Sequence, residues 1–176
     1  MWDGKCSGHG LLELIQKYKK KTITGLEIGC AEGDTTEYLL SNIPNLNLYG
    51  VDPYENYVDW NGNNLSSQEN SCSLMLEKIS PYQDRFIHYR EYSDTAASKF
   101  KAKSLDFIFI DGLHTYEQVL ADCRNYYAKV KSGGIFAGHD YRVIEAVNKA
   151  VNEFAQEVGI EQILETEVDV WYWIKP

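Results

Sequence analysis

Short apolar runs alternate along the chain with segments whose apolar residues recur every three or four positions. The first pattern is typical of buried parallel strands and the second of amphipathic helices. We predict strands at Ile23–Ile28, Leu46–Val51, Arg85–Tyr89, Ser104–Ile110 and Ile135–Gly138. We predict helices at Gly10–Lys20, Asp34–Ser41, Ser66–Ile79, Asp94–Phe100, Tyr116–Val130 and Val143–Val158. Strict alternation of strands and helices indicates a parallel sheet covered on both faces.

The C-terminal end of the chain has a different pattern. Ile160–Leu164 and Val168–Ile174 are strand-like runs separated by a few residues, which is too short for a parallel crossover. We therefore expect an α/β fold with a doubly wound, mostly parallel sheet that ends in an antiparallel hairpin. Pro53–Leu65 is expected to be a long loop, and Ser132-Gly133-Gly134 a turn.

Composition limits the classes of protein and partner. The 176 residues suit a single domain over 1–176, and the net charge of -9 disfavours binding to nucleic acid. No apolar run approaches the roughly 20 residues that span a bilayer, and the N-terminus has no signal-peptide pattern. Because the four cysteines are scattered, we expect reduced thiols and a cytoplasmic protein that binds no membrane.

A turn rich in small residues follows the first predicted strand. Gly29, Ala31 and Gly33 let the backbone approach a ligand, but the turn does not match the dinucleotide fingerprint G-x-G-x-x-G. Asp52 ends the second strand, about 20 residues further on, where an acid commonly binds ribose hydroxyls. The alternative for Asp52-Pro53 is an Asx turn that opens the loop.

A second set of polar residues follows two later strands. Asp111 and His114 come after the fourth strand, and His139 and Asp140 after the fifth. Carboxyl ends of neighbouring parallel strands meet at one edge of a sheet, so we expect the four side chains to converge. Asp122, on the next helix, is equally consistent with a surface acid.

Together these segments resemble class I S-adenosylmethionine-dependent methyltransferases over nearly the whole chain after residue 22. The resemblance implies that the Gly29–Gly33 turn faces the methionine moiety, that Glu27 holds its amino group, and that Asp52 binds the ribose. It places Tyr92 and Ser93 beside the adenine. An ordinary strand-end acid is the alternative for Glu27.

The motifs around Asp111 and Asp140 resemble a subgroup of small metal-dependent O-methyltransferases, which includes catechol-type and sugar- and antibiotic-modifying enzymes. The resemblance implies that Asp111, His139 and Asp140 bind a divalent metal, magnesium or manganese, with Asp111 also beside the cofactor. It implies that His114 is the general base. His139 departs from the family's usual acid, which disfavours magnesium or leaves His139 as a substrate contact. Packing at the helix start is the alternative for His114.

The resulting hypothesis is an S-adenosylmethionine-dependent methyltransferase acting on a hydroxyl of a small molecule, a sugar or glycan precursor or a phenol. The alternatives are a nicotinamide-dependent oxidoreductase and a catalytically silent binding protein with the same fold. By analogy with other small domains of this class, we also expect a homodimer.

Overall fold

The computed structural model describes residues 7–18, 22–59 and 61–176, and it contains a seven-stranded sheet and a separate strand pair. The strands are β1 (Ile23–Ile28), β2 (Leu46–Val51), β3 (Tyr57–Val58), β4 (Asn64–Leu65), β5 (Phe86–Tyr89), β6 (Leu105–Ile110), β7 (Val130–Gly138), β8 (Leu164–Glu165) and β9 (Trp171–Ile174). The α-helices are α1 (Ser7–Ile15), α2 (Asp34–Asn42), α3 (Gln68–Ile79), α4 (Ser93–Ala96), α5 (Tyr116–Tyr127) and α6 (Glu145–Glu157). Two 3-10 turns, Ser80–Tyr82 and Ala97–Lys99, follow α3 and α4.

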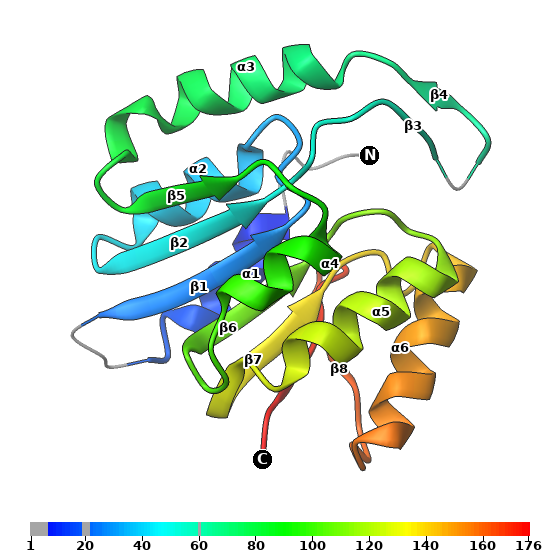
Figure 1. The fold of residues 1–176 in the computed structure, drawn as a ribbon. Helices are drawn as coiled ribbons and strands as arrows, with labels where there is room; N and C mark the ends of the chain where they lie inside the picture. The colour runs from blue at the N-terminus through cyan, green and yellow to red at the C-terminus, as the bar shows by residue number, and fades with distance from the viewer. Residues whose placement is uncertain (1–6, 19–21, 60) are drawn as a thin grey trace.

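The large sheet has the strand order β5-β2-β1-β6-β7-β9-β8. The first five strands in that order pair in parallel (Figure 1). Strand β9 runs antiparallel to both β7 and β8. The predicted fold class is therefore confirmed, including the antiparallel strands at the C-terminal end.

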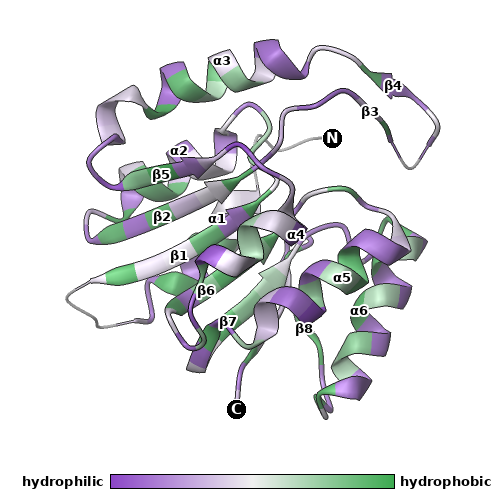
Figure 2. Ribbon diagram, viewed as in Figure 1, coloured by the Kyte–Doolittle hydropathy of each residue, from purple (hydrophilic) through white to green (hydrophobic). Residues whose placement is uncertain are grey.

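Helices cover the sheet in two layers because the strands present apolar side chains to both faces. In β6, Phe107 and Phe109 pack in the core beneath α1, α2 and α3, while Ile108 and Ile110 pack in the core beneath α4, α5 and α6. Every residue of β6 is buried, as expected for a central strand. Figure 2 shows the hydrophobic colour concentrated on β6 and β7 and mixed with hydrophilic colour on the helices.

The observed elements differ from the predicted ones most clearly in four places. The first helix is Ser7–Ile15 rather than Gly10–Lys20, and residues 19–21 lie outside the described ones. The predicted loop Pro53–Leu65 contains the small antiparallel pair β3 and β4. The predicted strand Ile160–Leu164 is wrong, because only Leu164–Glu165 pairs with β9.

The fourth difference concerns the predicted turn Ser132-Gly133-Gly134. These residues lie inside β7 as an irregularity, since Leu105 pairs with Val130 but Phe107 pairs with Ile135. Backbone hydrogen bonds tie this irregularity to Lys175, which explains why the segment remains part of β7: Gly133 N–H donates to Lys175 O and Lys175 N–H to Gly134 O. The preceding helix accordingly ends at Tyr127 instead of Val130.

Two expectations about the chain as a whole can be compared with the structure. Cys30, Cys72 and Cys123 are free, as predicted, and the structure shows them to be buried, while Cys6 lies outside the described residues. None of the helices in the described part of the chain has the length and apolar character needed to cross a membrane.

Candidate active site

A cavity of about 590 Å³ opens at the carboxyl ends of β1, β2 and β6. Its walls come from the turn after β1, the connection after β2, the start of α4, and the segment between β6 and α5. The predicted residues Glu27, Gly29, Ala31, Asp52, Tyr92, Ser93, Asp111 and His114 all line it. Segments far apart in the sequence therefore meet at the edge of the sheet where open α/β folds bind ligands.

The turn after β1 is shaped by its glycines. Gly29 has φ +85°, and a Cβ placed on it would lie 2.1 Å from the backbone oxygen of Asp111. Gly33 has φ +81°, and a Cβ there would lie 2.9 Å from the side chain of Met75. Positive φ and close backbone contact both require glycine at position 29. This contact couples the turn to the segment that carries Asp111 and His114.

Asp52 holds the same turn from the end of β2. Its Oδ2 accepts the N–H groups of Cys30 and Ala31 at 3.0 and 3.1 Å, and its Oδ1 accepts the N–H of Tyr54 at 2.9 Å. The bond to Tyr54 is the Asx turn expected as the alternative. Because a carboxylate has about four acceptor positions, these bonds leave capacity for a hydroxyl group. Ribose binding by Asp52 stays a prediction.

Glu27 is a buried acid at the end of β1. It is 2% exposed, and the hydroxyl of Thr36 donates a hydrogen bond to its Oε2. Burial raises the pKa of Glu27 to about 8; the Thr36 hydrogen bond opposes the rise, and the charges of Asp111 and Asp52 add to it. A positively charged ligand group would supply the counter-charge that this carboxylate lacks.

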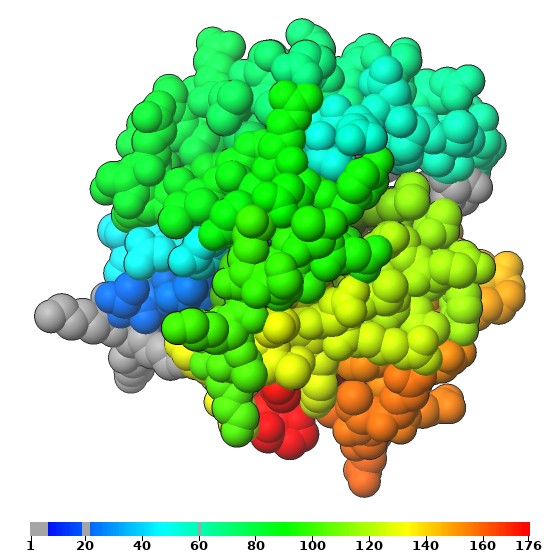
Figure 3. Space-filling view, viewed as in Figure 1, coloured from blue at the N-terminus to red at the C-terminus, as the bar shows by residue number. Residues whose placement is uncertain are grey.

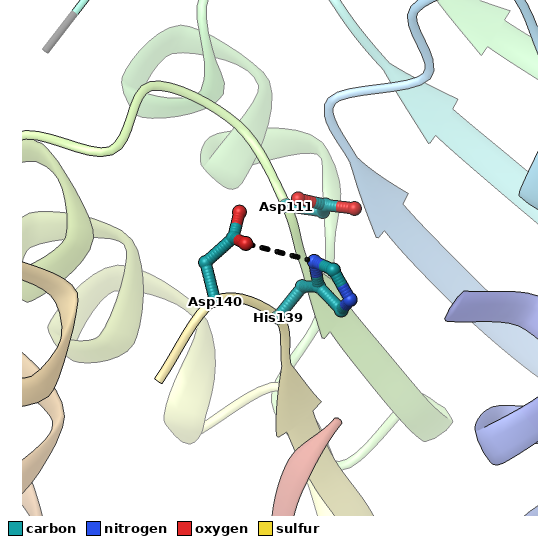
Figure 4. A group of neighbouring side chains, drawn as sticks. All are labelled: Asp111, His139 and Asp140. Atoms are coloured by element: carbon teal, nitrogen blue, oxygen red, sulfur yellow. Dashed lines mark ion pairs between the residues drawn. The ribbon is translucent and has the colours of Figure 1, made fainter. Parts of the chain in front are cut away.

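Four side chains form the predicted second group at the ends of β6 and β7. His114 Nε2 lies 3.2 Å from Asp111 Oδ1 and 3.0 Å from Asp140 Oδ2, so the imidazole bridges the two carboxylates. His139 Nδ1 lies 3.3 Å from Asp140 Oδ1 (Figure 4). The predicted convergence of these four residues is therefore present in the structure.

The carboxylates and imidazoles of this group shift one another's ionisation. Burial alone would lower the pKa of both histidines. Hydrogen bonds and charge from Asp111 and Asp140 instead raise the pKa of His114 to about 9. The same two acids, together with Asp169, raise the pKa of His139 to about 9. Burial would raise the pKa of Asp140, but hydrogen bonds from the two histidines hold it well below its usual range. The two carboxylates thus attract positive charge to the space between them.

The same group has donor atoms suited to a metal ion. Asp111, His139 and Asp140 each offer one ligand atom, and these atoms lie within 4.8 Å of one another. His139 Nε2 lies 3.1 Å from the carbonyl oxygen of Val168, which accepts an N–H from that nitrogen. A carbonyl partner of this kind fixes the tautomer of metal-binding histidines, and the other nitrogen, Nδ1, which faces Asp140, would coordinate after losing its proton. The residues therefore fit a cation with mixed nitrogen and oxygen ligands.

The structure corrects the surface position considered for Asp122, and it adds Gln118, which was not among the predicted residues, to the cavity wall. Asp122 is not a surface acid: it is 1% exposed and lines the cavity together with Gln118. Its position three residues after Val119 puts it on the buried face of α5, which helical spacing alone would have indicated. Tyr57 also lines the cavity, with 40% of its surface exposed.

Comparisons with known proteins agree with this geometry. A family model described as a methyltransferase domain matches residues 26–141. An uncharacterized protein of Acanthamoeba polyphaga mimivirus is 30% identical over 154 residues, which is 81% of this chain and 66% of that protein, just under two thirds of its length.

Solved structures share the fold at low identity. The O-methyltransferase NovP superimposes with a TM-score of 0.70 at 15% identity, covering 96% of this chain and 77% of NovP. An rRNA methylase from Streptococcus thermophilus superimposes with a TM-score of 0.66 at 11% identity, covering 96% of this chain and 94% of that one. Since the family model matches more than half of the sequence, the chain belongs to the methyltransferase-domain family and has the class I S-adenosylmethionine-dependent methyltransferase fold.

Proposed function

We propose that this protein transfers a methyl group from S-adenosylmethionine to a hydroxyl group of a small molecule, a sugar or glycan precursor or a phenol. The observation that carries this proposal is the position of His114 between Asp111 and Asp140, beside a cavity whose glycine turn contacts Asp111. A cofactor held against that turn has its methyl group near the histidine, as an in-line displacement requires.

The cavity has the electrostatic character that this cofactor needs. S-adenosylmethionine carries a sulfonium and an ammonium charge, and Glu27, Asp52 and Asp111 place carboxyl groups along the cavity. Glu27 pairs with the ammonium group and Asp52 with the ribose. Both roles agree with the burial of Glu27 and with the position of Asp52 beside the turn.

The acceptor is a small molecule rather than RNA in this proposal. None of the described residues that line the cavity is a lysine or an arginine, and the chain has a net charge of -9. Phosphate backbones are bound mainly by such cations. The rRNA methylase shares the fold, but the cavity of this chain is lined by acids.

His114 is the general base in this proposal. Its Nε2 accepts the proton of the acceptor hydroxyl, and such a base contributes roughly 10²–10⁴-fold to a rate. Because Asp111 and Asp140 hold a proton on His114, the imidazole becomes free to accept one only when positive charge compensates the two carboxylates. The cationic cofactor contributes part of that compensation.

Asp111, Asp140 and Nδ1 of His139 hold a divalent metal in the same proposal. Their donor set, with one nitrogen, favours manganese, iron, nickel or zinc over magnesium. A divalent ion there would supply a Lewis acid that lowers the pKa of a hydroxyl group and fixes its orientation. Val168, through its carbonyl group, keeps the His139 ring in the orientation that this role needs.

Calorimetric titration with S-adenosylhomocysteine, with and without manganese or magnesium, tests the proposal, with NAD as the control ligand. We expect binding of S-adenosylhomocysteine, none of NAD, and a metal-binding heat that disappears in Asp111→Ala. Failure of S-adenosylhomocysteine to bind under every metal condition would contradict the methyltransferase assignment.

The variant His114→Ala separates a catalyst from a silent binding protein. A catalyst loses turnover with its acceptor while keeping its affinity for S-adenosylhomocysteine. A wild-type protein that binds the cofactor but transfers no methyl group to hydroxyl acceptors, with or without metal, would support the silent alternative.

A further inference from the structure

The connection between β8 and β9 (residues 166–170), here called the β8–β9 link, lies against His139 although it supplies none of the proposed metal ligands. The carbonyl oxygen of Val168, in this link, accepts the N–H of His139 Nε2 at 3.1 Å. Trp171, which follows the link, donates from its Nε1 to the carbonyl oxygen of His139 at 3.1 Å. His139 is thus held through its ring and through its backbone, and the position of its ring depends on where the β8–β9 link lies.

Arg142 holds the β8–β9 link in place. Its Nη2 donates to the carbonyl oxygen of Thr166 at 2.7 Å. Its Nε and its backbone N–H both donate to Oδ1 of Asp169, at 3.2 and 3.1 Å, and the same Nε lies 3.0 Å from Oε2 of Glu165. A planar guanidinium that donates to several acceptors at once fixes their relative positions better than a single ion pair does. One side chain therefore joins the end of β8 to two points of the link.

The backbone is unusual on both sides of this contact. Asp140 and Asp169 have φ of +61° and +58°, in the left-handed region that non-glycine residues adopt rarely. Such conformations persist where the surrounding structure imposes them, and they are frequent at functional sites. Asp140 is a proposed metal ligand, and Asp169 is the residue that Arg142 binds from two positions beyond Asp140. The bonds of Arg142 therefore join the two left-handed residues across the site.

Helix α1 packs against the same link. A Cβ placed on Gly10 would lie 2.6 Å from Oγ1 of Thr166 and 2.8 Å from Cγ2 of Val168, so the helix and the link are in direct contact with no spare room. The link is therefore held by α1 and by Arg142. Of these two, Arg142 belongs to the segment that follows β7 and carries the proposed ligands.

A metal ion bound in the proposed function, on which this inference rests, takes its one nitrogen ligand from His139. Asp111 and Asp140 alone would present only oxygen, which is the ligand atom that magnesium prefers. Residues that orient a metal-binding histidine change metal affinity by about 10- to 100-fold. We propose that Arg142 is a positioning residue: it fixes the β8–β9 link, the Val168 carbonyl group in that link fixes the His139 ring, and the site thereby favours manganese over magnesium.

A matched pair of variants tests the inference. Arg142→Met and Arg124→Met each keep the aliphatic stem and remove a guanidinium group. The two arginine side chains are similarly exposed, 48% and 50%, and both pair with carboxylates. Arg124 joins α5 to Glu153 and Glu157 of α6, two helices that lie side by side on the face shown in Figure 3, and it does not line the cavity.

Two quantities are measured for each protein, and thermal unfolding shows whether each variant is folded. The first is the ratio of the dissociation constants for magnesium and manganese, obtained by calorimetry. The second is the nitrogen hyperfine coupling of bound manganese in pulsed electron paramagnetic resonance, which reports a coordinated imidazole. Loss of this coupling in His139→Gln assigns it to that residue. Neither quantity depends on the methyl acceptor or on turnover.

We expect wild type and Arg124→Met to show the same nitrogen coupling and the same preference for manganese. In Arg142→Met, the affinity for manganese should fall by about 10- to 100-fold, the affinity for magnesium should change less, and the nitrogen coupling should weaken or disappear. Arg142→Lys keeps the charge but carries all its donors on one nitrogen, so its affinity for manganese should lie between those of wild type and Arg142→Met. The lysine variant also serves as the test if Arg142→Met does not fold.

Three results would overturn the inference, and they differ from one another. A folded Arg142→Met variant that is less stable but keeps the nitrogen coupling and the preference for manganese would leave Arg142 with a purely structural role. Binding of manganese by wild type without a coupling assigned to His139 would remove the ring that Arg142 is proposed to position. Failure of wild type to bind either ion would contradict the metal site of the proposed function and, with it, the inference.

Discussion

Binding of the cofactor should release a proton from Glu27, and this release can be measured directly. Glu27 is 2% exposed and has a pKa raised to about 8, chiefly by burial, so most molecules hold a proton there at neutral pH. The ammonium group of S-adenosylhomocysteine binds the ionised carboxylate in the proposed function. Occupancy of the site should therefore lower the pKa of Glu27 and expel the proton.

The magnitude follows from the raised pKa. With a pKa of about 8, Glu27 is protonated in about nine of ten molecules at pH 7, so binding should release about 0.9 protons. Because the ionised fraction rises about ninefold between pH 6 and pH 7, affinity should rise by nearly the same factor over that interval. The direction of this pH dependence follows from the raised pKa of Glu27. As the pH falls, more of the free protein holds a neutral Glu27, which must lose its proton before it can bind a cation, so the affinity falls.

Calorimetry in buffers of different ionisation enthalpy counts the released protons. The variant Glu27→Gln keeps a hydrogen-bond acceptor for Thr36 but cannot titrate, so it should bind more weakly, release no proton from this position and lose the pH dependence. Wild-type binding without proton release, or a Glu27→Gln variant with the same release as wild type, would refute the reasoning.

Further predictions concern the glycine turn, the base and the buried acid of α5. Gly29→Ala should abolish S-adenosylhomocysteine binding, because its Cβ would lie 2.1 Å from the backbone oxygen of Asp111. The control Gly133→Ala also has a positive φ, +76°, but open space around it. It should keep binding and lower the stability in thermal unfolding by only about 1–2 kcal/mol. His114→Gln should lower turnover by about 10²–10⁴-fold without changing cofactor affinity. The raised pKa of Asp122 destabilises the native state increasingly as the pH rises from 3.8 to about 7. The free energy of unfolding of Asp122→Asn, measured in urea, should therefore increase relative to that of wild type by about 2–3 kcal/mol between pH 5 and pH 8. A difference that does not change with pH would contradict this prediction.

The fold followed from local pattern to a large extent. Apolar runs such as Leu105–Ile110 and the helical spacing of α5 depend on interactions within a few residues and on burial, and both are visible in sequence. The short link before β9 also settled that this strand runs antiparallel to the strand before it, because so few residues cannot cross a sheet. Boundaries were less accurate where long-range pairing decides them, as at Gly133-Gly134, which the contact with Lys175 keeps within β7.

For the candidate site, too, the sequence indicated the residues, and the tertiary structure decided how they interact. The sequence alone proposed Glu27, Asp52, Asp111, His114, His139 and Asp140 as site residues, because motifs at strand ends indicate which side chains reach one edge of the sheet.

Only the tertiary structure decided how these residues act on one another: that His114 bridges two carboxylates, and that Val168 orients His139. It also decided that Asp122 lies inside the cavity wall. Hydrogen bonds and burial between segments many residues apart have no local signature, because they depend on where the chain returns after each crossover and on which side chains then exclude water.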